Sequence, residues 1–282
     1  MIKYRNYVTA ALGYFDGVHL GHREVLKSAL VPDYYESAVF TFNSRIPCNI
    51  TTDDTKHKLI RELGIEQIHS YNFESLKDYS PEEFVEKILV KGLNAKFVYC
   101  GFDFRFGKKR SAFADDLARI CGEYGIVTII KKPVIIDGIT VSSSHIRELI
   151  HEGNIKIANK FLGYELFYEL EVVGGNRLGR TIGFPTINQN MPQNVLPPKF
   201  GVYKSRVSVK GVEFKSITNI GIKPTAGENK NITIETHIIG YDGDLYGKVI
   251  KVSLLDFVRA ERKFTSFEEL SQQIKNDLEV IK

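Results

Sequence analysis

The pattern of apolar residues changes near residue 160, and this change constrains the fold more than any other feature of the chain. Before it, short apolar runs alternate with segments whose apolar residues recur at helical spacing. After Gly163 the chain is β-rich, with glycine turns such as Gly174-Gly175 and Asp242-Gly243. A length of 282 residues is sufficient for two domains with their own cores. We therefore expect one domain over residues 1–160 and a second over residues 163–282.

The first domain is expected to be an α/β domain. Its strand–helix alternation predicts a mostly parallel sheet covered by helices on both faces. The expected strands are Ala38–Phe42, Gln67–Phe73, Lys96–Cys100 and Ile126–Ile130. The expected helices are Glu24–Leu30, Asp53–Leu63, Pro81–Leu93 and Ala114–Tyr124. Ser80 and Glu83 have the spacing of a capping box at the start of the third helix. Ligands of such sheets bind beyond the carboxyl ends of the strands.

The second domain is expected to be an antiparallel barrel closed by one helix. The expected strands are Tyr168–Val173, Gly201–Val209, Ser216–Ile220, Ile232–Ile239 and Val249–Phe257. The helix is expected over Ser266–Ile281, where Ser266 and Glu269 again have the spacing of a capping box.

Composition and charge argue against several classes of protein. The formal net charge is only +4 and is shared between the two halves, which disfavours a dedicated nucleic-acid binder. Cys48, Cys100 and Cys121 form no C-x-x-C pair, so neither a disulfide framework nor a cysteine zinc site is indicated. No stretch approaches the roughly 20 apolar residues of a membrane helix, and the first residues lack the apolar run of a signal peptide. We expect a cytoplasmic protein without nucleic-acid or membrane partners.

The segment Gly13–His22 contains three glycines and two histidines where a strand should turn into a helix. Such a turn presents backbone N–H groups and the positive end of a helix to a phosphate. The N–H groups of His19 and His22 can bind the phosphates of a nucleoside triphosphate and stabilise the charge that develops as pyrophosphate leaves. Gly21 allows a close approach of the backbone. The pattern favours nucleotidyl transfer over a purely structural role of the two histidines.

Two further segments of the first half have side chains that suit a nucleotide or a flat aromatic ligand. In Ser142–Arg147, hydroxyls at a helix start precede an arginine, which fits an anion clamp and equally a helix cap with a solvated Arg147. In Gly101–Gly107, three phenylalanines alternate with charged residues. They can hold a flat ring beside a phosphate, or they can belong to the core and to a solvated loop.

A second glycine-rich segment, Gly179–Asn188, predicts another polyphosphate and metal site of different design. Thr186 and Asn188 are two residues apart on an extended segment, so their hydroxyl and amide point the same way and can share a metal–phosphate site. We expect Mg²⁺ at Thr186 and Asn188, bound together with ATP. The residues expected to form a loop over the phosphates are Gly175, Gly179, Arg180 and Gly183.

Taken together and in this order, the motifs closely resemble the prokaryotic bifunctional riboflavin kinase/FMN adenylyltransferase (FAD synthetase) family over nearly the whole chain. The matching segments are Gly13–His22, Gly101–Gly107, Ser142–Arg147, Gly183–Asn188, Asn219–Thr225, Glu235–His237, Asp244–Gly247 and Arg259–Glu261. The resemblance implies a Rossmann-like nucleotidyltransferase domain, followed by a six-stranded antiparallel riboflavin kinase barrel with a C-terminal helix.

The resemblance also implies the roles of individual residues. Glu235 is expected to be the general base that takes the proton of the riboflavin 5′-hydroxyl, and Arg259 and Glu261 are expected to bind the flavin of the kinase. In the adenylyltransferase half, the catalytic residues are expected to be His19 and His22. Its ATP ligands are expected to be Gly13, Phe15, Asp16, Gly21, Ser143, Ser144 and Arg147. Its flavin ligands are expected to be Asp103, Phe104 and Phe106.

Two reactions follow from the resemblance: riboflavin and ATP give FMN, and FMN and ATP give FAD with release of pyrophosphate. The first half departs from the family at Thr41–Pro47, which lacks the histidine of the family's T-F-x-P-H-P segment. A riboflavin kinase with a degenerate first half is therefore an alternative, although the retention of His19, His22, Asp103 and Arg147 argues against it. A flavin-sensing regulatory protein is a further alternative, and self-association stays open.

Overall fold

The computed structural model describes residues 7–31, 35–43, 48–175, 178–223 and 231–280. Contacts between residues divide the chain into two compact units, Met1–Ser143 and Ser144–Lys282. The segments Ser44–Pro47 and Pro224–Thr225, which belong to two of the family motifs, lie outside the described residues, as does Ile281. In the described parts of the chain, none of the helices has the length and apolar character needed to cross a membrane.

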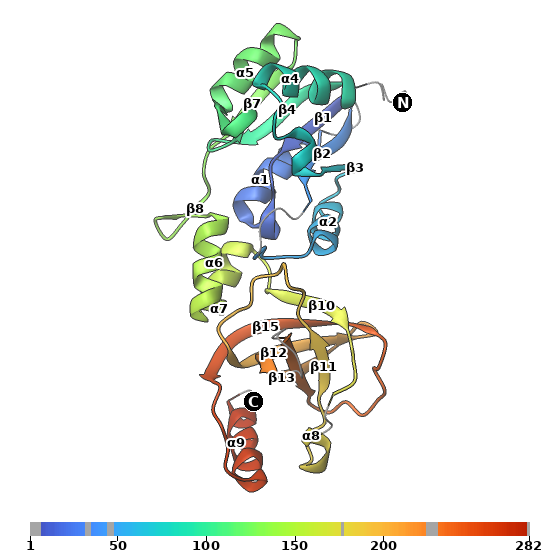
Figure 1. Cartoon of the computed structure of the whole chain (residues 1–282), viewed down its shortest axis with the longest axis vertical. Helices are drawn as coiled ribbons and strands as arrows, with labels where there is room; N and C mark the ends of the chain where they lie inside the picture. Colours follow the sequence, from blue (N-terminus) through green and yellow to red (C-terminus); the bar gives the residue numbers. More distant parts are fainter. Residues whose placement is uncertain (1–6, 32–34, 44–47, 176–177, 224–230, 281–282) are drawn as a thin grey trace. The chain divides into compact units, whose positions relative to one another are not determined.

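The first unit is built on a five-stranded parallel sheet in the order β3-β2-β1-β4-β7 (Figure 1). Its strands are β1 (Val8–Leu12), β2 (Glu36–Phe42), β3 (Gln67–Tyr71), β4 (Ala95–Gly101) and β7 (Val127–Lys131). Its helices include α1 (Leu20–Ser28), α2 (Asp53–Glu62), α3 (Phe73–Leu76), α4 (Pro81–Phe84) and α5 (Ala114–Glu123). The central strand β1 is buried along its whole length, as expected for a parallel sheet with both faces covered. The predicted Rossmann-like α/β fold is confirmed.

Two helices differ from their expected bounds. The helix expected over Glu24–Leu30 is α1, which begins at Leu20 because the side chain of His19 caps it. The helix expected over Pro81–Leu93 divides into α4 and a π-helical segment, Val85–Gly92.

The start of α4 follows the predicted capping box. Ser80 Oγ accepts the Glu83 N–H at 3.1 Å, and the Glu83 carboxylate accepts the Ser80 N–H at 3.0 Å.

The second unit is a nearly closed antiparallel barrel of six strands in the order β10-β15-β12-β13-β14-β11. Its strands are β10 (Phe167–Glu171), β11 (Ile187–Asn190), β12 (Gly201–Val209), β13 (Val212–Lys223), β14 (Asn231–Ile238) and β15 (Val249–Ala260). The two ends of the sheet approach each other where the Val173 N–H donates to the Asn188 carbonyl at 2.8 Å. The predicted six-stranded barrel with a final helix, α9 (Phe267–Glu279), is confirmed.

The cap of α9 differs from the prediction in one detail. Ser266 Oγ accepts the Glu269 N–H at 3.2 Å, but the Glu269 carboxylate accepts the N–H of Thr265, at 3.0 Å, rather than that of Ser266. The predicted capping box is therefore only half formed. Glu269 also accepts a hydrogen bond from Arg262 Nη2 at 2.6 Å, which draws its carboxylate away from the cap.

Four hydroxyl side chains form a hydrogen-bonded chain inside the barrel. Ser205 of β12 bonds to both Ser216 and Thr218 of β13 at 2.7 Å, and Thr218 bonds to Thr236 of β14 at 2.8 Å. All four are buried, so each bond satisfies a polar group that would otherwise be costly in an apolar interior. These hydrogen bonds favour one register of β14 against β13.

Two helices, α6 (Ser143–Glu152) and α7 (Ile155–Leu162), contact the barrel. Asn159 Nδ2 donates to the Leu254 carbonyl at 2.9 Å, and the Lys199 N–H donates to the Ile150 carbonyl at 3.2 Å. Because of such contacts, α6 and α7 fall in the second compact unit. The expected domain limits, 1–160 and 163–282, concern the two functional modules and stay a prediction.

The three cysteines differ in burial. Cys100 and Cys121 belong to the core of the first unit, whereas Cys48 is exposed. Burial raises the pKa of the Cys100 thiol to about 12 and the pKa of the Cys121 thiol to about 11. Both buried thiols therefore stay protonated, and thus weakly nucleophilic, at neutral pH.

We expect a thiol reagent at about pH 8 to react at once with one cysteine of the native protein, Cys48, because the other two thiols are buried and protonated. Cys100 and Cys121 should react only after denaturation, and the fast reaction should disappear in Cys48→Ser. Immediate reaction of all three thiols would show that the core around Cys100 and Cys121 is open.

Candidate active sites

The glycine- and histidine-rich loop of the first unit connects β1 to α1. Phe15 and Val18 have left-handed φ values of 54° and 39°, and Gly17 has a φ of 76°. Residues other than glycine pay a conformational cost in this region, and such strain is concentrated at functional sites. Asp16 is buried and fastens the loop, because its carboxylate accepts the Ile50 N–H at 2.8 Å.

Ser143, which is distant in sequence, also stabilises this loop by a hydrogen bond. Its hydroxyl donates to the Asp16 carbonyl at 3.0 Å across 127 positions of sequence. Asp16 and Ser143 were expected to bind ATP. In the structure, both residues form hydrogen bonds that hold the loop in its conformation. Their contact with ATP stays a prediction.

His19 and His22 stack on each other at the start of α1, with ring centroids 3.5 Å apart. His19 Nδ1 accepts the His22 N–H at 3.2 Å and so caps the helix. A ring nitrogen that accepts a hydrogen bond carries no proton, so we assign the proton of His19 to Nε2, where it can be donated. Gly21 leaves space for this ring, since a Cβ at residue 21 would lie 3.2 Å from it.

A cavity of about 450 Å³ adjoins this loop. Its apolar lining includes Leu12, Phe40, Phe42, Phe73, Leu76, Tyr79 and Phe84. The predicted site residues that line it are Gly13, Phe15, His22, Asp103, Phe104 and Phe106. Phe104 and Phe106 stack with their ring centroids 5.8 Å apart, and Phe106 also belongs to the core. The structure thus brings two predicted segments, Gly13–His22 and Gly101–Gly107, to one apolar cavity.

Ser144 and Arg147 lie in α6, where Ser144 is exposed and Arg147 is half-buried. Both residues belong to the second compact unit. Their expected role as ATP ligands stays a prediction.

In the barrel, the side chains of β14 alternate between the interior and an outer cavity. Ile234, Thr236 and Ile238 are buried, whereas Glu235 and His237 line the cavity. The expected general base is therefore fixed on a strand whose other face is packed in the core.

Two asparagines flank Glu235 across the sheet. Glu235 pairs in register with Asn188 of β11 and with Asn219 of β13. Side chains at paired positions of neighbouring strands project from the same face. The carboxylate is therefore placed between two neutral amides. Of these, Asn219 lines the same cavity as Glu235 and can donate a hydrogen bond to a substrate oxygen, whereas Asn188 is buried.

The outer cavity has a volume of about 250 Å³ and extends from the barrel face to α9. Its lining includes the predicted residues Gly179, Thr186, Glu235, Arg259 and Glu261. Apolar side chains from both sides complete it: Ile182, Phe184, Val202, Ile217, Phe264, Leu270 and Ile274. The cavity therefore combines apolar walls with a few charged groups, as small-molecule sites do.

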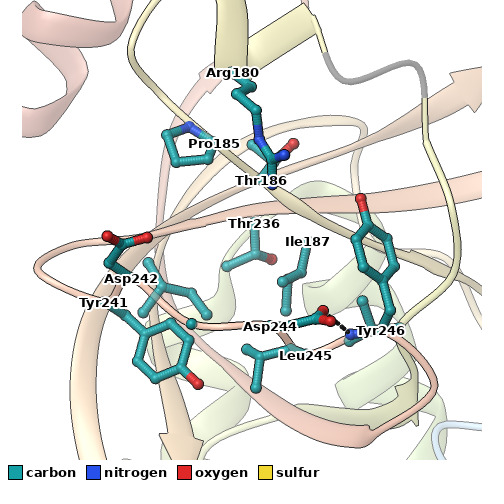
Figure 2. Close-up of a pocket in the computed structure, with 13 residues that line it drawn as sticks. Arg180, Pro185, Thr186, Ile187, Thr236, Tyr241, Asp242, Asp244, Leu245 and Tyr246 are labelled. Carbon is teal, nitrogen blue, oxygen red and sulfur yellow. Dashed lines mark hydrogen bonds between the residues drawn. The ribbon is translucent and has the colours of Figure 1, made fainter.

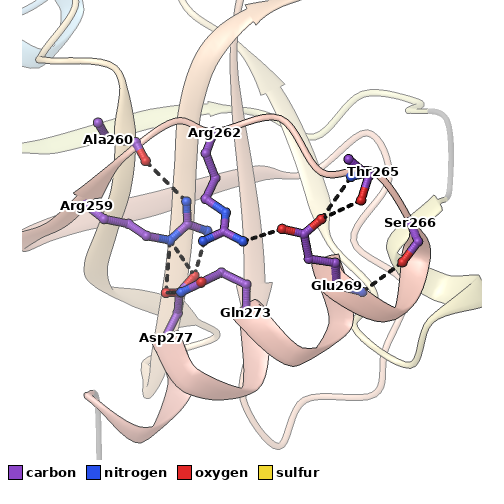
Figure 3. A network of polar contacts seen from close by, with 8 residues as sticks. All are labelled: Arg259, Ala260, Arg262, Thr265, Ser266, Glu269, Gln273 and Asp277. Carbon is purple, nitrogen blue, oxygen red and sulfur yellow. Dashed lines mark hydrogen bonds and ion pairs between the residues drawn. The ribbon is translucent and has the colours of Figure 1, made fainter.

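Arg259 is held by an aspartate that the sequence pattern had not indicated. Its Nε lies 3.0 Å from both carboxylate oxygens of Asp277, and its Nη2 lies 2.7 Å from Oδ2 (Figure 3). Asp277 is 3% exposed and also accepts a hydrogen bond from Gln273. Its position on the apolar stripe of α9, in line with Leu270 and Ile274, is the signal that could have revealed it.

Glu261 lies against β13. Asn219 Nδ2 donates to Glu261 Oε1 at 3.3 Å, and a Cβ at residue 221 would collide with the Glu261 carboxylate. Gly221 thus leaves room for the Glu261 carboxylate in this arrangement, and a side chain at residue 221 would displace it.

A second cavity, of about 490 Å³, shares Thr186 with the first (Figure 2). Its polar lining residues are Arg180, Thr186, Thr236, Tyr241, Asp242, Asp244 and Tyr246. The Tyr246 N–H donates to Asp244 Oδ1 at 3.0 Å, which orders the loop that closes this cavity. Thr186 lines both cavities and marks their junction.

The residues expected to hold Mg²⁺ have suitable chemistry. Mg²⁺ takes oxygen ligands, so a hydroxyl and an amide oxygen can complete its coordination beside substrate phosphates and water. Gly175 leaves Asn188 the space it needs, since a Cβ there would lie 2.5 Å from Asn188 Nδ2. His237 Nδ1 bonds to the Pro185 carbonyl at 2.8 Å and so fixes the backbone before Thr186. Within the described ranges, no cluster of three or more His, Cys, Asp and Glu side chains could hold a metal by itself.

Comparison with known proteins agrees with this arrangement. The family model described as FAD synthetase matches residues 2–145, and the one described as riboflavin kinase matches residues 162–282. The bifunctional riboflavin kinase/FMN adenylyltransferase of Bacillus subtilis is 34% identical over 287 residues, covering 95% of this chain and 89% of that protein. The Escherichia coli K12 protein of the same description is 31% identical and covers 94% of this chain and 89% of its own length.

A crystal structure from Streptococcus pneumoniae, described as a macrolide-efflux protein, has a similar fold. It is 30% identical to this chain, with a TM-score of 0.87, and the match covers 98% of this chain and 94% of that one. The two family models follow each other in the order of the two compact units, and the named relatives match over most of their own length. The chain therefore belongs to the bifunctional riboflavin kinase/FMN adenylyltransferase family.

Proposed function

We propose that this enzyme carries out the two reactions of its family at the two sites described above. The barrel phosphorylates riboflavin to FMN, and the parallel-sheet unit adenylylates FMN to FAD with release of pyrophosphate. The observation that carries the kinase assignment is the position of Thr186, which lines both the cavity of Glu235 and the cavity of Arg180. A phosphoryl group that passes from one substrate to another must cross such a junction, with the reacting atoms held in line.

In the kinase reaction, riboflavin occupies the cavity between the barrel and α9, and ATP occupies the cavity of Arg180. Glu235 takes the proton of the 5′-hydroxyl while that oxygen bonds to the γ-phosphorus and the bond to the leaving ADP breaks. Asn219, which flanks Glu235 across the sheet and lines the same cavity, orients the hydroxyl. Arg259, fixed by Asp277, and Glu261 bind the flavin.

Thr186 and Asn188 would hold Mg²⁺ together with the ATP phosphates. The ion would neutralise charge on the transferring phosphoryl group. Gly175, Gly179, Arg180 and Gly183 belong to the loop that covers the phosphates, and Arg180 supplies its cation.

In the adenylyltransferase reaction, a phosphate oxygen of FMN attacks the α-phosphorus of ATP, and the bond to pyrophosphate breaks. An ionised phosphate needs no protein base. His19 Nε2–H and the His22 ring instead stabilise the charge of the leaving pyrophosphate. The flavin ring lies in the apolar cavity beside Phe104, with Asp103 at its edge.

No observation on the described residues favours the two alternatives, a kinase with a degenerate first half or a flavin-sensing regulator. Although the histidine of the T-F-x-P-H-P segment is missing, His19, His22, Asp103 and Arg147 are retained, and the segments Gly13–His22 and Gly101–Gly107 share one cavity. The free thiols of Cys100 and Cys121 support the proposal that the enzyme works in a reducing cytoplasm.

We expect Glu235→Gln to lose FMN formation by a factor of about 10² to 10⁴, because the amide cannot accept the hydroxyl proton. The same protein should convert supplied FMN to FAD at the normal rate, which serves as an internal control for folding and concentration. Near-normal FMN formation by the variant would rule out Glu235 as the base.

The converse variant is His19→Asn. Asparagine is a good N-cap, so α1 should keep its start while the Nε2–H donor is lost. We expect FAD formation from FMN to fall by about a hundredfold or more, with riboflavin phosphorylation unchanged. If both activities stayed at the normal level in separate assays, His19 would have no part in adenylyl transfer.

The metal assignment predicts different outcomes for two substitutions of Thr186. Thr186→Ser keeps the hydroxyl and should keep kinase activity within about threefold, whereas Thr186→Ala should need a higher Mg²⁺ concentration and turn over about tenfold or more slowly. The measurement is kinase rate against Mg²⁺ concentration, with a chelator as the zero point. Identical Mg²⁺ curves for both variants would contradict the assignment.

A further inference from the structure

The two flavin cavities carry opposite charge. On the basis of the function proposed above, we propose that this difference sorts flavins by phosphorylation state, and that Arg105 and Arg110 recognise the phosphate of FMN at the adenylyltransferase site. Riboflavin has no charge at neutral pH, whereas the phosphomonoester of FMN carries about −1.5 to −2. The charge of a cavity therefore changes the affinity for FMN, while the affinity for riboflavin is almost unaffected.

Cations outnumber carboxylates in the cavity of the first unit. Its charged lining residues are Lys77, Arg105, Arg110 and Asp103, which give the lining a formal charge of +2. Lys77 is paired with Glu74, and both side chains of this pair are exposed. Arg105 and Arg110 are therefore the cations that can attract an anionic flavin.

Both arginines belong to ordered backbone. Arg105 lies in β5 (Arg105–Phe106), which pairs with β6 (Ala112–Phe113), and its guanidinium carbon is 4.4 Å from the centre of the Phe113 ring. The Arg110 N–H donates to the Gly107 carbonyl at 2.9 Å. Arg110 has a left-handed φ of 59°, a conformation that is costly for a residue with a long side chain.

The guanidinium of Arg110 is available for a ligand. It lines the cavity, and no side chain in the described part of the chain forms an ion pair with it. A guanidinium can donate two parallel hydrogen bonds to a phosphate, so Arg110 suits the anionic end of FMN while the flavin ring lies against the apolar wall.

In the cavity of the barrel, carboxylates outnumber cations. Its charged lining residues are Glu235, Glu261, Asp277, Arg259 and Arg262, which give the lining a formal charge of −1. Both arginines are in ion pairs, Arg259 with Asp277 at 2.7 Å and Arg262 with Glu269 at 2.6 Å. Glu235 and Glu261 are the carboxylates that face a ligand. Uncharged riboflavin is accepted there, while the phosphate of FMN, once released from the nucleotide and metal, is repelled.

The test compares Arg110→Gln and Arg105→Gln with a matched control, Lys109→Gln. Lys109 lies in the same turn as Arg110 and has a similar φ of 56°, but it does not line the cavity. The KM for FMN in FAD formation and the KM for riboflavin in FMN formation are measured at about 50 mM and about 300 mM NaCl, because added salt screens charge–charge attraction.

We expect Arg110→Gln to raise the KM for FMN by about ten- to hundredfold, the effect of losing a charge-assisted hydrogen bond, and to flatten its salt dependence. Arg105→Gln should act in the same direction, and Lys109→Gln should change the KM by less than about threefold at matched salt. The KM for riboflavin in FMN formation should be unchanged in all three variants and should not respond to salt, because this reaction takes place at the other cavity.

A KM for FMN that is unchanged in both arginine variants and insensitive to salt would overturn the charge-sorting proposal while leaving the proposed function intact. If the unmodified enzyme formed no FAD, the adenylyltransferase assignment would fail instead. The charge-sorting proposal can then still be tested by titrating the protein with FMN and with riboflavin and following binding by flavin fluorescence. Salt-sensitive FMN binding that is lost in Arg110→Gln would support it, and equal binding of FMN by both proteins would overturn it.

Discussion

The alternation of side chains along β14 is the constraint on which the kinase site depends. Thr236 faces the interior, where its hydroxyl bonds to Thr218 at 2.8 Å as part of a buried chain that continues to Ser205. Glu235, the preceding residue, therefore faces the outer cavity. A slip of β14 by one residue would move each of its side chains to the opposite face, burying the Glu235 carboxylate and exposing the Thr236 hydroxyl. The polar groups in the core thus fix the register that presents Glu235, the proposed base, to the cavity.

In the first unit, a loop rather than a strand positions the predicted site residues. Beyond the carboxyl end of β1, a left-handed backbone turn is held by Asp16, whose carboxylate bonds to the Ile50 N–H and whose carbonyl accepts from Ser143. This frame lets His19 cap α1 and keep a donor on its other nitrogen. The linings of the two cavities also differ in formal charge, which is the basis of the proposed sorting of an uncharged flavin from its phosphate ester.

The spacing of apolar residues predicted the α/β character of the first unit and five strands of the barrel, because this spacing reports directly on strands and helices. The sixth barrel strand, β11, followed only from the family resemblance. The sequence also identified the segments that line the cavities, including Thr186 and Glu235. It did not reveal Asp277, since a carboxylate on a helix looks solvated until the strand that carries its arginine partner is placed beside it. Nor did it reveal that Asp16 and Ser143 brace a loop, because a hydrogen bond across 127 positions leaves no local pattern. The π-helical segment Val85–Gly92 likewise has the apolar spacing of an ordinary helix.

The most direct test of two reactions on one chain is a time course of the purified protein with riboflavin, ATP and Mg²⁺, with the flavins separated chromatographically. We predict that FMN rises first and then declines as FAD forms, and that FMN supplied directly is converted to FAD without a lag. Accumulation of FMN with no FAD, including when FMN is the starting flavin, would contradict two active sites. It would leave a riboflavin kinase joined to an inactive nucleotidyltransferase module.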